Sequence, residues 1–137
     1  MGDRQTKILI VEDEPVVLHT LQLILQQHGY DVREARDAAE ALTIAPDFQP
    51  DTLLCDINLP DIDGIQLSLQ LKHDLPHCRV VLLSGDISSS ELLDEAKRKG
   101  YRFEVLAKPT DPQYLLRVLS DPKTASHWNS TGIHRVK

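Results

Sequence analysis

Residues 52–64 read Thr-Leu-Leu-Cys-Asp-Ile-Asn-Leu-Pro-Asp-Ile-Asp-Gly, and this stretch decides how the chain folds. Its first four residues form an apolar run of the kind found in strands that are buried on both faces. Asp56 follows this run directly, and the Asp63-Gly64 pair predicts a turn before a helix over about 65–72. A buried strand with an acidic residue at its end and a helix beyond it predicts one unit of a parallel sheet.

The same pattern recurs on both sides of this stretch. Further strands are predicted at residues 8–11, 30–34, 79–83 and 103–107. Helical spacing and capping residues between them predict helices that begin at Pro15, at Asp37 with Glu40, near Ile65, at residues 88–91 (Ser-Ser-Ser-Glu) and at Asp111-Pro112. Five strand–helix units predict an α/β fold, a (βα)5 doubly wound five-stranded parallel sheet with right-handed crossovers.

The composition is that of one globular domain. The chain has 137 residues, of which 41% are hydrophobic, and its net charge of -6 argues against a surface for nucleic acid. Cys55 and Cys78 adjoin apolar runs, which predicts buried thiols in a reducing compartment rather than a disulfide. The first apolar run, residues 8–11, is too short for a signal peptide or a membrane span. We therefore expect a cytoplasmic protein.

The last part of the chain loses the apolar periodicity. We expect a domain over residues 1–120 and a polar tail over 121–137, which need not be ordered. This tail is too short to be an output domain. Trp128 and the basic residues at 134–137 would suit a docking segment, although a solvated tail fits the composition better.

Reactive residues stand at the ends of four predicted strands. Glu12 and Asp13 follow the first strand, Asp56 the third, Ser84 the fourth and Lys108 the fifth. Each alone is commonly a cap, a turn or a solvated side chain. However, open parallel sheets bind ligands beyond the carboxyl ends of their strands, where these side chains would meet. The repeated placement therefore predicts one site.

The residue types at this edge suit phosphoryl transfer. Three carboxylates that lie together repel one another, and a divalent cation with oxygen ligands, Mg²⁺ or Mn²⁺, is the usual remedy. Asp56 would then attack phosphorus and form an aspartyl phosphate. Lys108 would pair with the incoming negative charge, and the Ser84 hydroxyl would bind a phosphoryl oxygen.

With these motifs the chain resembles the receiver domains of two-component response regulators over about residues 7–119. The resemblance is carried by residues 8–15 (Ile-Leu-Ile-Val-Glu-Asp-Glu-Pro), 56–64, 82–85 (Leu-Leu-Ser-Gly) and 106–109 (Leu-Ala-Lys-Pro). It implies a CheY-like fold with the flavodoxin-like strand order 2-1-3-4-5. It also implies that a histidine kinase or a histidine phosphotransfer protein phosphorylates Asp56.

The resemblance assigns further roles. Asp13 would be a direct ligand of the metal beside the acceptor aspartate, with Glu12 as its acidic neighbour, and Asn58 would offer its backbone carbonyl. Ser84 would move toward the phosphoryl group. Asn58 and Asp86 match positions that influence how fast the phosphate is hydrolysed, and the Lys108–Pro109 bond would be cis.

One position departs from the family pattern. Three residues before the lysine the family commonly has Tyr or Phe, whereas this chain has Val105, and Phe103 lies too far along the strand to replace it. We hypothesise that phosphorylation still draws Ser84 and the loop after it inward, and that the fourth helix repacks without an aromatic rotamer switch.

The expected function is a switch in partner binding, not that of a dedicated enzyme, because such a protein catalyses only its own phosphorylation and dephosphorylation. The resemblance implies a surface for an output partner or a homodimer on the fourth helix, fifth strand and fifth helix. Neither a nucleic-acid nor a membrane partner is expected.

Three alternatives stay open at this point. The chain could be a receiver fragment of a longer regulator or hybrid kinase, or an interaction domain that works without phosphorylation. It could also be a magnesium-dependent phosphohydrolase. Enzymes that resemble the haloacid dehalogenase family place their nucleophile in a DxD motif after the first strand, where this chain has Glu12-Asp13-Glu14.

Overall fold

The computed structural model describes residues 4–121 and 134–135. Its strands are β1 (Lys7–Val11), β2 (Asp31–Ala35), β3 (Thr52–Asp56), β4 (Arg79–Ser84), β5 (Tyr101–Arg102), β6 (Glu104–Ala107) and β7 (His134–Arg135). Its helices are α1 (Pro15–Gln27), α2 (Ala38–Phe48), α3 (Gly64–Asp74), α4 (Ile87–Arg98) and α5 (Pro112–Ser120). No helix among these is long and apolar enough to cross a membrane.

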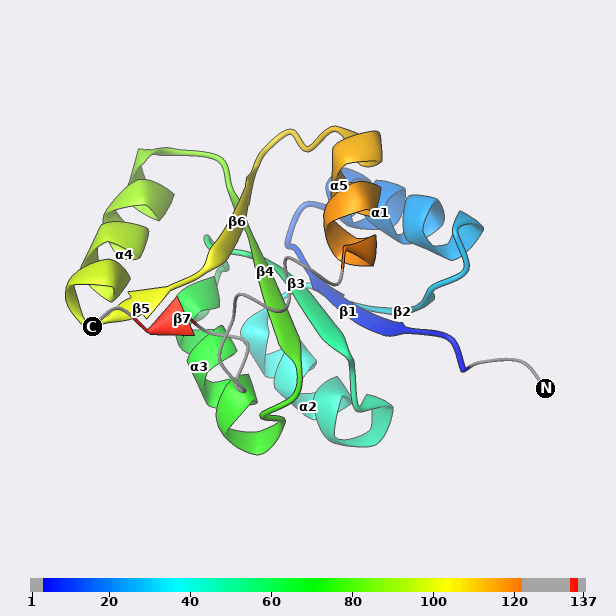
Figure 1. Cartoon of the computed structure of the whole chain (residues 1–137), viewed down its shortest axis with the longest axis horizontal. Coiled ribbons are helices and arrows are strands. Elements are labelled where there is room, and N and C mark those ends of the chain that lie inside the picture. The colour runs from blue at the N-terminus through cyan, green and yellow to red at the C-terminus, as the bar shows by residue number, and fades with distance from the viewer. Residues whose placement is uncertain (1–3, 122–133, 136–137) are drawn as a thin grey trace.

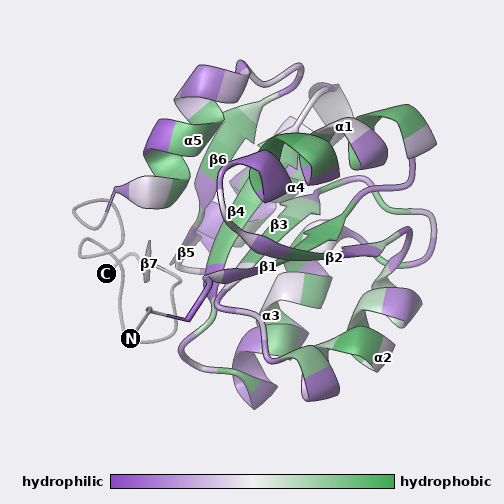
Figure 2. Ribbon diagram, turned by 90° about the vertical axis from the view of Figure 1, so that its right-hand side faces the viewer, coloured by the Kyte–Doolittle hydropathy of each residue, from purple (hydrophilic) through white to green (hydrophobic). Residues whose placement is uncertain are grey.

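Five strands form one parallel sheet in the order β2-β1-β3-β4-β6. Because β5 is a two-residue piece outside this sheet, β6 is the fifth strand of the predicted fold, and the expected order 2-1-3-4-5 is confirmed. Helices α1 and α5 lie on one side of the sheet and α2 and α3 on the other, while α4 lies beyond the β6 edge (Figure 1). Strands in the middle of the sheet are mostly hydrophobic, whereas the helices carry bands of both kinds of residue (Figure 2).

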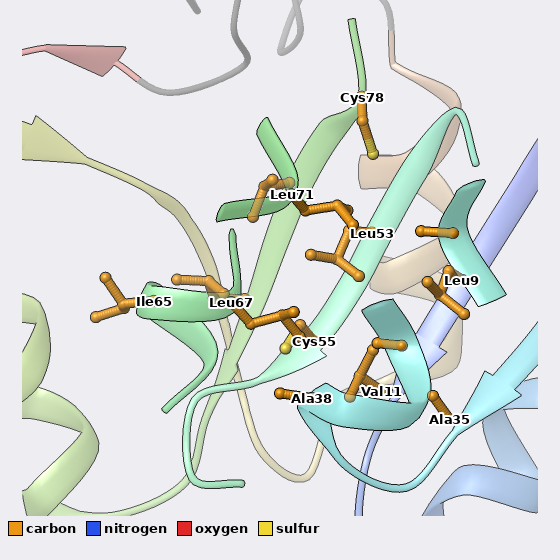
Figure 3. Close-up of a cluster of buried hydrophobic side chains, with 14 of the residues drawn as sticks. Leu9, Val11, Ala35, Ala38, Leu53, Cys55, Ile65, Leu67, Leu71 and Cys78 are labelled. Carbon is orange, nitrogen blue, oxygen red and sulfur yellow. The ribbon is translucent and has the colours of Figure 1, made fainter. Parts of the chain in front are cut away.

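The sheet separates two apolar clusters because its inner strands are buried on both faces. Leu9 and Val11 of β1 point into the cluster under α2 and α3, together with Leu53 and Cys55 of β3 (Figure 3). Alternate residues such as Ile8, Ile10 and Leu54 fill the cluster under α1 and α5. Both cysteines are free and buried, as the sequence predicts.

One detail of the predicted elements is wrong. Helix α4 begins at Ile87 with Asp86 as its N-cap, not at a serine cap, because the Asp86 carboxylate accepts from the Ser89 backbone N–H. The fifth strand predicted at residues 103–107 is confirmed as β6, and Tyr101–Arg102 just before it pairs antiparallel with His134–Arg135 outside the parallel sheet. The polar tail therefore has regular structure at residues 134–135, while residues 122–133 and 136–137, with Trp128, lie outside the described part of the chain.

Helix α2 is capped by two aspartates. Asp37 accepts from the Glu40 backbone N–H at 2.8 Å, as the capping pattern predicts. Asp61, from the loop between β3 and α3, accepts from the N–H groups of Ala38 at 3.0 Å and Ala39 at 2.9 Å. Desolvation alone would raise the pKa of the Asp61 carboxylate, but its hydrogen bonds to backbone N–H groups together outweigh it and lower this pKa. The loop that follows Asp56 is thereby tied to α2.

We expect Asp61→Ala to lower the free energy of unfolding by about 1 kcal/mol near neutral pH, the usual cost of losing a helix cap. A carboxylate whose folded pKa is depressed stabilises the fold above its unfolded pKa, which is near 3.8. This contribution is lost as the pH falls through the folded pKa, so the difference between the two proteins should begin to shrink as the pH falls below about 4. Urea unfolding across pH 3–7 measures this difference.

Asp47→Ala is the matched control, because Asp47 is an exposed carboxylate near the other end of α2, where it makes no favourable interaction with the helix dipole. We expect no loss of stability in this variant. A pH-independent difference between wild type and Asp61→Ala would contradict the capping role.

A buried ion pair ties the opposite end of the sheet to α5. The Arg79 guanidinium at the start of β4 donates Nε–H to Glu104 at 3.0 Å, and its side chain is 13% exposed against 8% for Glu104. The same guanidinium donates to the backbone carbonyls of Leu119 at 3.2 Å and Val118 at 2.9 Å. One side chain therefore joins β4, β6 and the last turn of α5.

Candidate functional site

The sheet register brings the predicted site residues to one edge. Val11 of β1 pairs with Cys55 of β3, so the next residues, Glu12 and Asp56, are neighbours. Backbone hydrogen bonds extend this order beyond the strands, because Lys108 N donates to Ser84 O at 2.9 Å. The carboxyl ends of the inner strands thus meet as the sequence predicts.

Three carboxylates form the centre of the site. Glu12 is fully buried and Asp56 is 4% exposed, whereas Asp13 faces solvent. One carboxylate oxygen from each residue lies within 4.8 Å of the other two. Carboxylate oxygens are ligands that Mg²⁺ takes in proteins, together with water molecules that it keeps. The residues present therefore fit a divalent cation.

Lys108 links two of these carboxylates. Its Nζ lies 2.8 Å from Glu12 Oε2 and 3.2 Å from Asp56 Oδ2. Burial alone would lower the pKa of the Lys108 amine, but the bonds to Glu12 and Asp56 outweigh it and raise this pKa. Burial raises the pKa of Glu12, and the salt bridge to Lys108 offsets only part of that rise. Lys108 is therefore firmly cationic in the site.

The Asp63-Gly64 turn has a glycine at a position where a larger side chain would clash with the backbone. Gly64 N donates to Ile57 O at 2.7 Å, which closes the loop over the end of β3. A Cβ at Gly64 would stand 2.3 Å from the backbone oxygen of Asp56. The sequence predicts a turn here, but the close approach to the Asp56 backbone is visible only in three dimensions.

Asn58 contacts Asp56 and the start of α4 at once. Its backbone N–H donates to Asp56 Oδ1 at 3.2 Å. Its side-chain amide donates to both carboxylate oxygens of Asp86, at 2.8 and 2.9 Å, and to Ser89 Oγ at 2.9 Å. The resemblance gives Asn58 a backbone carbonyl for the metal and, with Asp86, an influence on phosphate hydrolysis, but it does not predict the hydrogen bonds that join these side chains to Ser89.

The structure places Ser84 and Val105 less directly in the site. Ser84 is half-buried at the end of β4, and its flanking residues Leu83 and Gly85 line the site cavity. Leu106 faces the α1 and α5 cluster, so Val105 points to the opposite side, where it is 36% exposed. Phe103 packs against the other cluster. A valine therefore stands where an aromatic switch residue is common.

A cavity of about 660 Å³ opens onto these groups. Its polar end is formed by the acidic residues, Asn58, Asp86 and Lys108. Its apolar end lies between α1 and α5, with Val17, Leu21 and Leu115 in the wall. The Lys108–Pro109 peptide bond at its rim is cis. The cavity can admit a charged group to Asp56 from solvent.

Comparison with known families agrees with this geometry. Residues 8–120 match the family described as the response regulator receiver domain. The chain belongs to this family. The resemblance stated from the sequence motifs is thereby confirmed.

Curated relatives include both short and long proteins. Protein PilH of Pseudomonas aeruginosa is 31% identical over 116 residues, which cover 83% of this chain and 94% of PilH. The transcriptional regulatory protein GlrR of Escherichia coli K12 is 28% identical over 98% of this chain, but the match spans only 31% of GlrR. The chain therefore covers nearly all of one relative and about a third of another.

Solved structures show the same fold. The signal receiver domain of an HD domain-containing protein from Pseudomonas fluorescens Pf-5 matches with a TM-score of 0.78 and 29% identity, over 93% of this chain and 91% of that chain. A CheY-like receiver domain protein from Methanospirillum hungatei JF-1 matches with a TM-score of 0.76 and 26% identity, over 90% and 96% of the two chains.

Proposed function

We propose that this protein is a phosphorelay switch that accepts a phosphoryl group on Asp56 from a phosphohistidine of a histidine kinase or a histidine phosphotransfer protein. The observation that carries the proposal is the position of Lys108, whose ammonium lies between the buried Glu12 and Asp56 carboxylates at the open end of the sheet. A cation held there is placed to meet the negative charge of an entering phosphoryl group.

The proposed reaction is an in-line transfer. A carboxylate oxygen of Asp56 attacks phosphorus and forms a new O–P bond. The P–N bond of the donor breaks, and its electron pair returns to the imidazole nitrogen, which takes up a proton from water. Lys108 stays bound to the site and pairs with a phosphoryl oxygen, and the Ser84 hydroxyl donates to another once its loop has moved inward.

Asp13, Asp56 and the Asn58 carbonyl would hold Mg²⁺, with Glu12 as their acidic neighbour. The spacing of the three carboxylates within 4.8 Å supports this assignment. When bound, Mg²⁺ supplies the positive charge that offsets the carboxylates and the phosphoryl oxygens. Lys108 and the backbone N–H of Asn58 orient Asp56 through its two oxygens.

We further propose that phosphorylation draws Ser84 and the following loop inward and repacks α4 without an aromatic switch. The exposed valine at position 105 supports this, because no ring stands there to swing. A structure with a bound phosphate mimic in which neither Ser84 nor residues 85–99 move would reject the mechanism.

An output partner or a second copy would read the change on the surface of α4, β6 and α5. The receiver would occupy residues 1–120, whether the protein acts alone or within a longer regulator.

The decisive test is incubation with Mg²⁺ and acetyl phosphate, followed by intact-mass measurement. We expect one phosphate-sized adduct on wild type and none on Asp56→Asn, because the amide is not a nucleophile for phosphorus. Asp47→Asn, an exposed aspartate far from the site edge, should be labelled as wild type is. Omission of Mg²⁺ should abolish labelling of both wild type and Asp47→Asn.

Three results would overturn the proposal. Unlabelled wild type, under conditions where calorimetry shows that Mg²⁺ binds, would rule out a phosphoacceptor role for Asp56. Steady turnover of generic phosphomonoesters would instead favour a phosphohydrolase. Unchanged partner binding and signalling in Asp56→Asn would favour an interaction domain that works without phosphorylation.

A further inference from the structure

A polar cluster connects the phosphoacceptor loop to the first turn of α4. Asn58 contributes its side-chain amide, Asp86 its carboxylate and Ser89 its hydroxyl, and we name these three residues the clamp. The Asn58 amide donates to Asp86 and Ser89, while Ser89 Oγ and Ser89 N each donate to Asp86 Oδ1 at 2.9 Å. Every member therefore contacts the other two.

Ser89 is the buried member of the clamp. It is 0% exposed, whereas Asn58 is half-buried and Asp86 is exposed. A buried hydroxyl is costly unless it is hydrogen-bonded, so the position favours the conformation in which Asn58 and Asp86 are both in place. The buried Ser89 thus fixes the two more accessible residues beside the site.

The described side chains of helix α4 bury little apolar surface near its N-terminal turn. Among its side chains that the structure describes, Ala96 in the last turns is the buried apolar one, and Leu92 and Leu93 are half-buried. Segments with few buried apolar contacts open at low free energy. The clamp joins the first turn of α4 to the loop after β3 by hydrogen bonds.

The clamp also faces the phosphoacceptor. Asn58 donates its backbone N–H to Asp56, and Asn58, Asp56 and Asp86 line the same cavity. A phosphoryl group on Asp56 would add negative charge and strong acceptor oxygens in that cavity. These oxygens would compete for the Asn58 amide and repel the Asp86 carboxylate.

We propose that the clamp is the coupling element between Asp56 and α4, with Ser89 as its positioning residue. In the unphosphorylated protein the clamp holds the first turn of α4, and phosphorylation opens it. This inference rests on the proposed function, because it needs a phosphoryl group on Asp56. It assigns transmission of the signal to the hydrogen bonds of the clamp. In this chain Val105 stands where the family commonly has an aromatic residue.

Hydrogen exchange of the α4 backbone, measured by mass spectrometry with and without Mg²⁺ and acetyl phosphate, tests the clamp. In wild type we expect exchange in α4 to become roughly fivefold faster or more on phosphorylation, the effect of losing about one hydrogen bond. In Ser89→Ala exchange should be fast before phosphorylation and change little afterwards. Ser90→Ala is the matched control, because Ser90 is the exposed neighbour, and it should behave as wild type does.

The variant Asp86→Asn distinguishes a signalling role of the clamp from a purely structural role of Asp86 as a helix cap. The amide oxygen still caps Ser89 N, so protection of α4 before phosphorylation should stay near that of wild type. Because a neutral amide is not repelled by the phosphoryl group, the response to phosphorylation should shrink. A structural cap alone predicts no such selective loss of response.

Intact mass from the same samples separates the two proposals. Wild type that carries one phosphate but shows unchanged α4 exchange overturns the clamp and leaves the phosphoacceptor role intact. The clamp proposal is also overturned if α4 in Ser89→Ala is as protected as in wild type and responds fully to phosphorylation. Absence of any adduct on wild type removes the phosphoacceptor role, and the clamp with it.

Discussion

Lys108→Met is expected to slow labelling of Asp56 by acetyl phosphate by roughly 100- to 1,000-fold, the usual effect of removing one preorganised group that stabilises transition-state charge. The ammonium is held 3.2 Å from Asp56 and 2.8 Å from Glu12, so no rearrangement is needed before it meets a phosphoryl oxygen. Methionine keeps much of the volume of the side chain and removes its charge. The rate of adduct formation by intact mass measures the effect.

Measuring Mg²⁺ binding distinguishes a variant that transfers the phosphoryl group more slowly from one that no longer binds the metal. Lys108 competes with any cation for Glu12 and Asp56, so Lys108→Met should bind Mg²⁺ as tightly as wild type or several-fold more tightly, by calorimetry. Lys99→Met removes an exposed lysine that pairs with Glu95 at 3.2 Å and should leave both quantities unchanged. Labelling of Lys108→Met at the wild-type rate would contradict the role assigned to this lysine.

Arg79→Met is expected to lower the free energy of unfolding by about 3–5 kcal/mol, because it leaves the buried Glu104 carboxylate without its cation. The carbonyls of Val118 and Leu119 lose the same partner, so the last turn of α5 should open first. Urea unfolding at neutral pH measures the loss. Hydrogen exchange in α5 locates it.

A second substitution tests whether the unpaired charge of Glu104 causes this loss of stability. In Arg79→Met/Glu104→Met the unpaired charge is gone, so much of the lost stability should return, since apolar pairs replace buried ion pairs at little cost. Lys99→Met, which breaks the exposed pair with Glu95, should cost no more than about 0.5 kcal/mol. A double variant as unstable as the sum of the single variants would show that packing, not charge, sets the cost.

The sheet and the site centre could be predicted from the sequence because both follow from local pattern. Apolar runs predict strands buried on both faces, and parallel order brings the residues after those runs to one edge. Glu12, Asp56 and Lys108 lie together for this reason.

Features that depend on tertiary contacts could not be predicted in this way. Asp86 and Ser88 are both good caps in sequence, and the contact of Asp86 with Asn58, which is distant in sequence, is visible only in the structure. Nothing local pairs Arg79 with Glu104, which lies 25 positions away. The pairing of Tyr101–Arg102 with His134–Arg135 likewise joins segments whose own sequences show no strand pattern.

The ion pairs of Lys108 have a consequence for how far a signal can travel. Converting the Asp56 carboxylate to an acyl phosphate changes its formal charge by only about one unit, beside a fixed cation. At physiological ionic strength such a change fades within a Debye length of about 8 Å. Long-range electrostatic attraction or repulsion is thus too weak to transmit the phosphorylation signal of this protein. Whatever reads the state of Asp56 has to touch atoms that have moved.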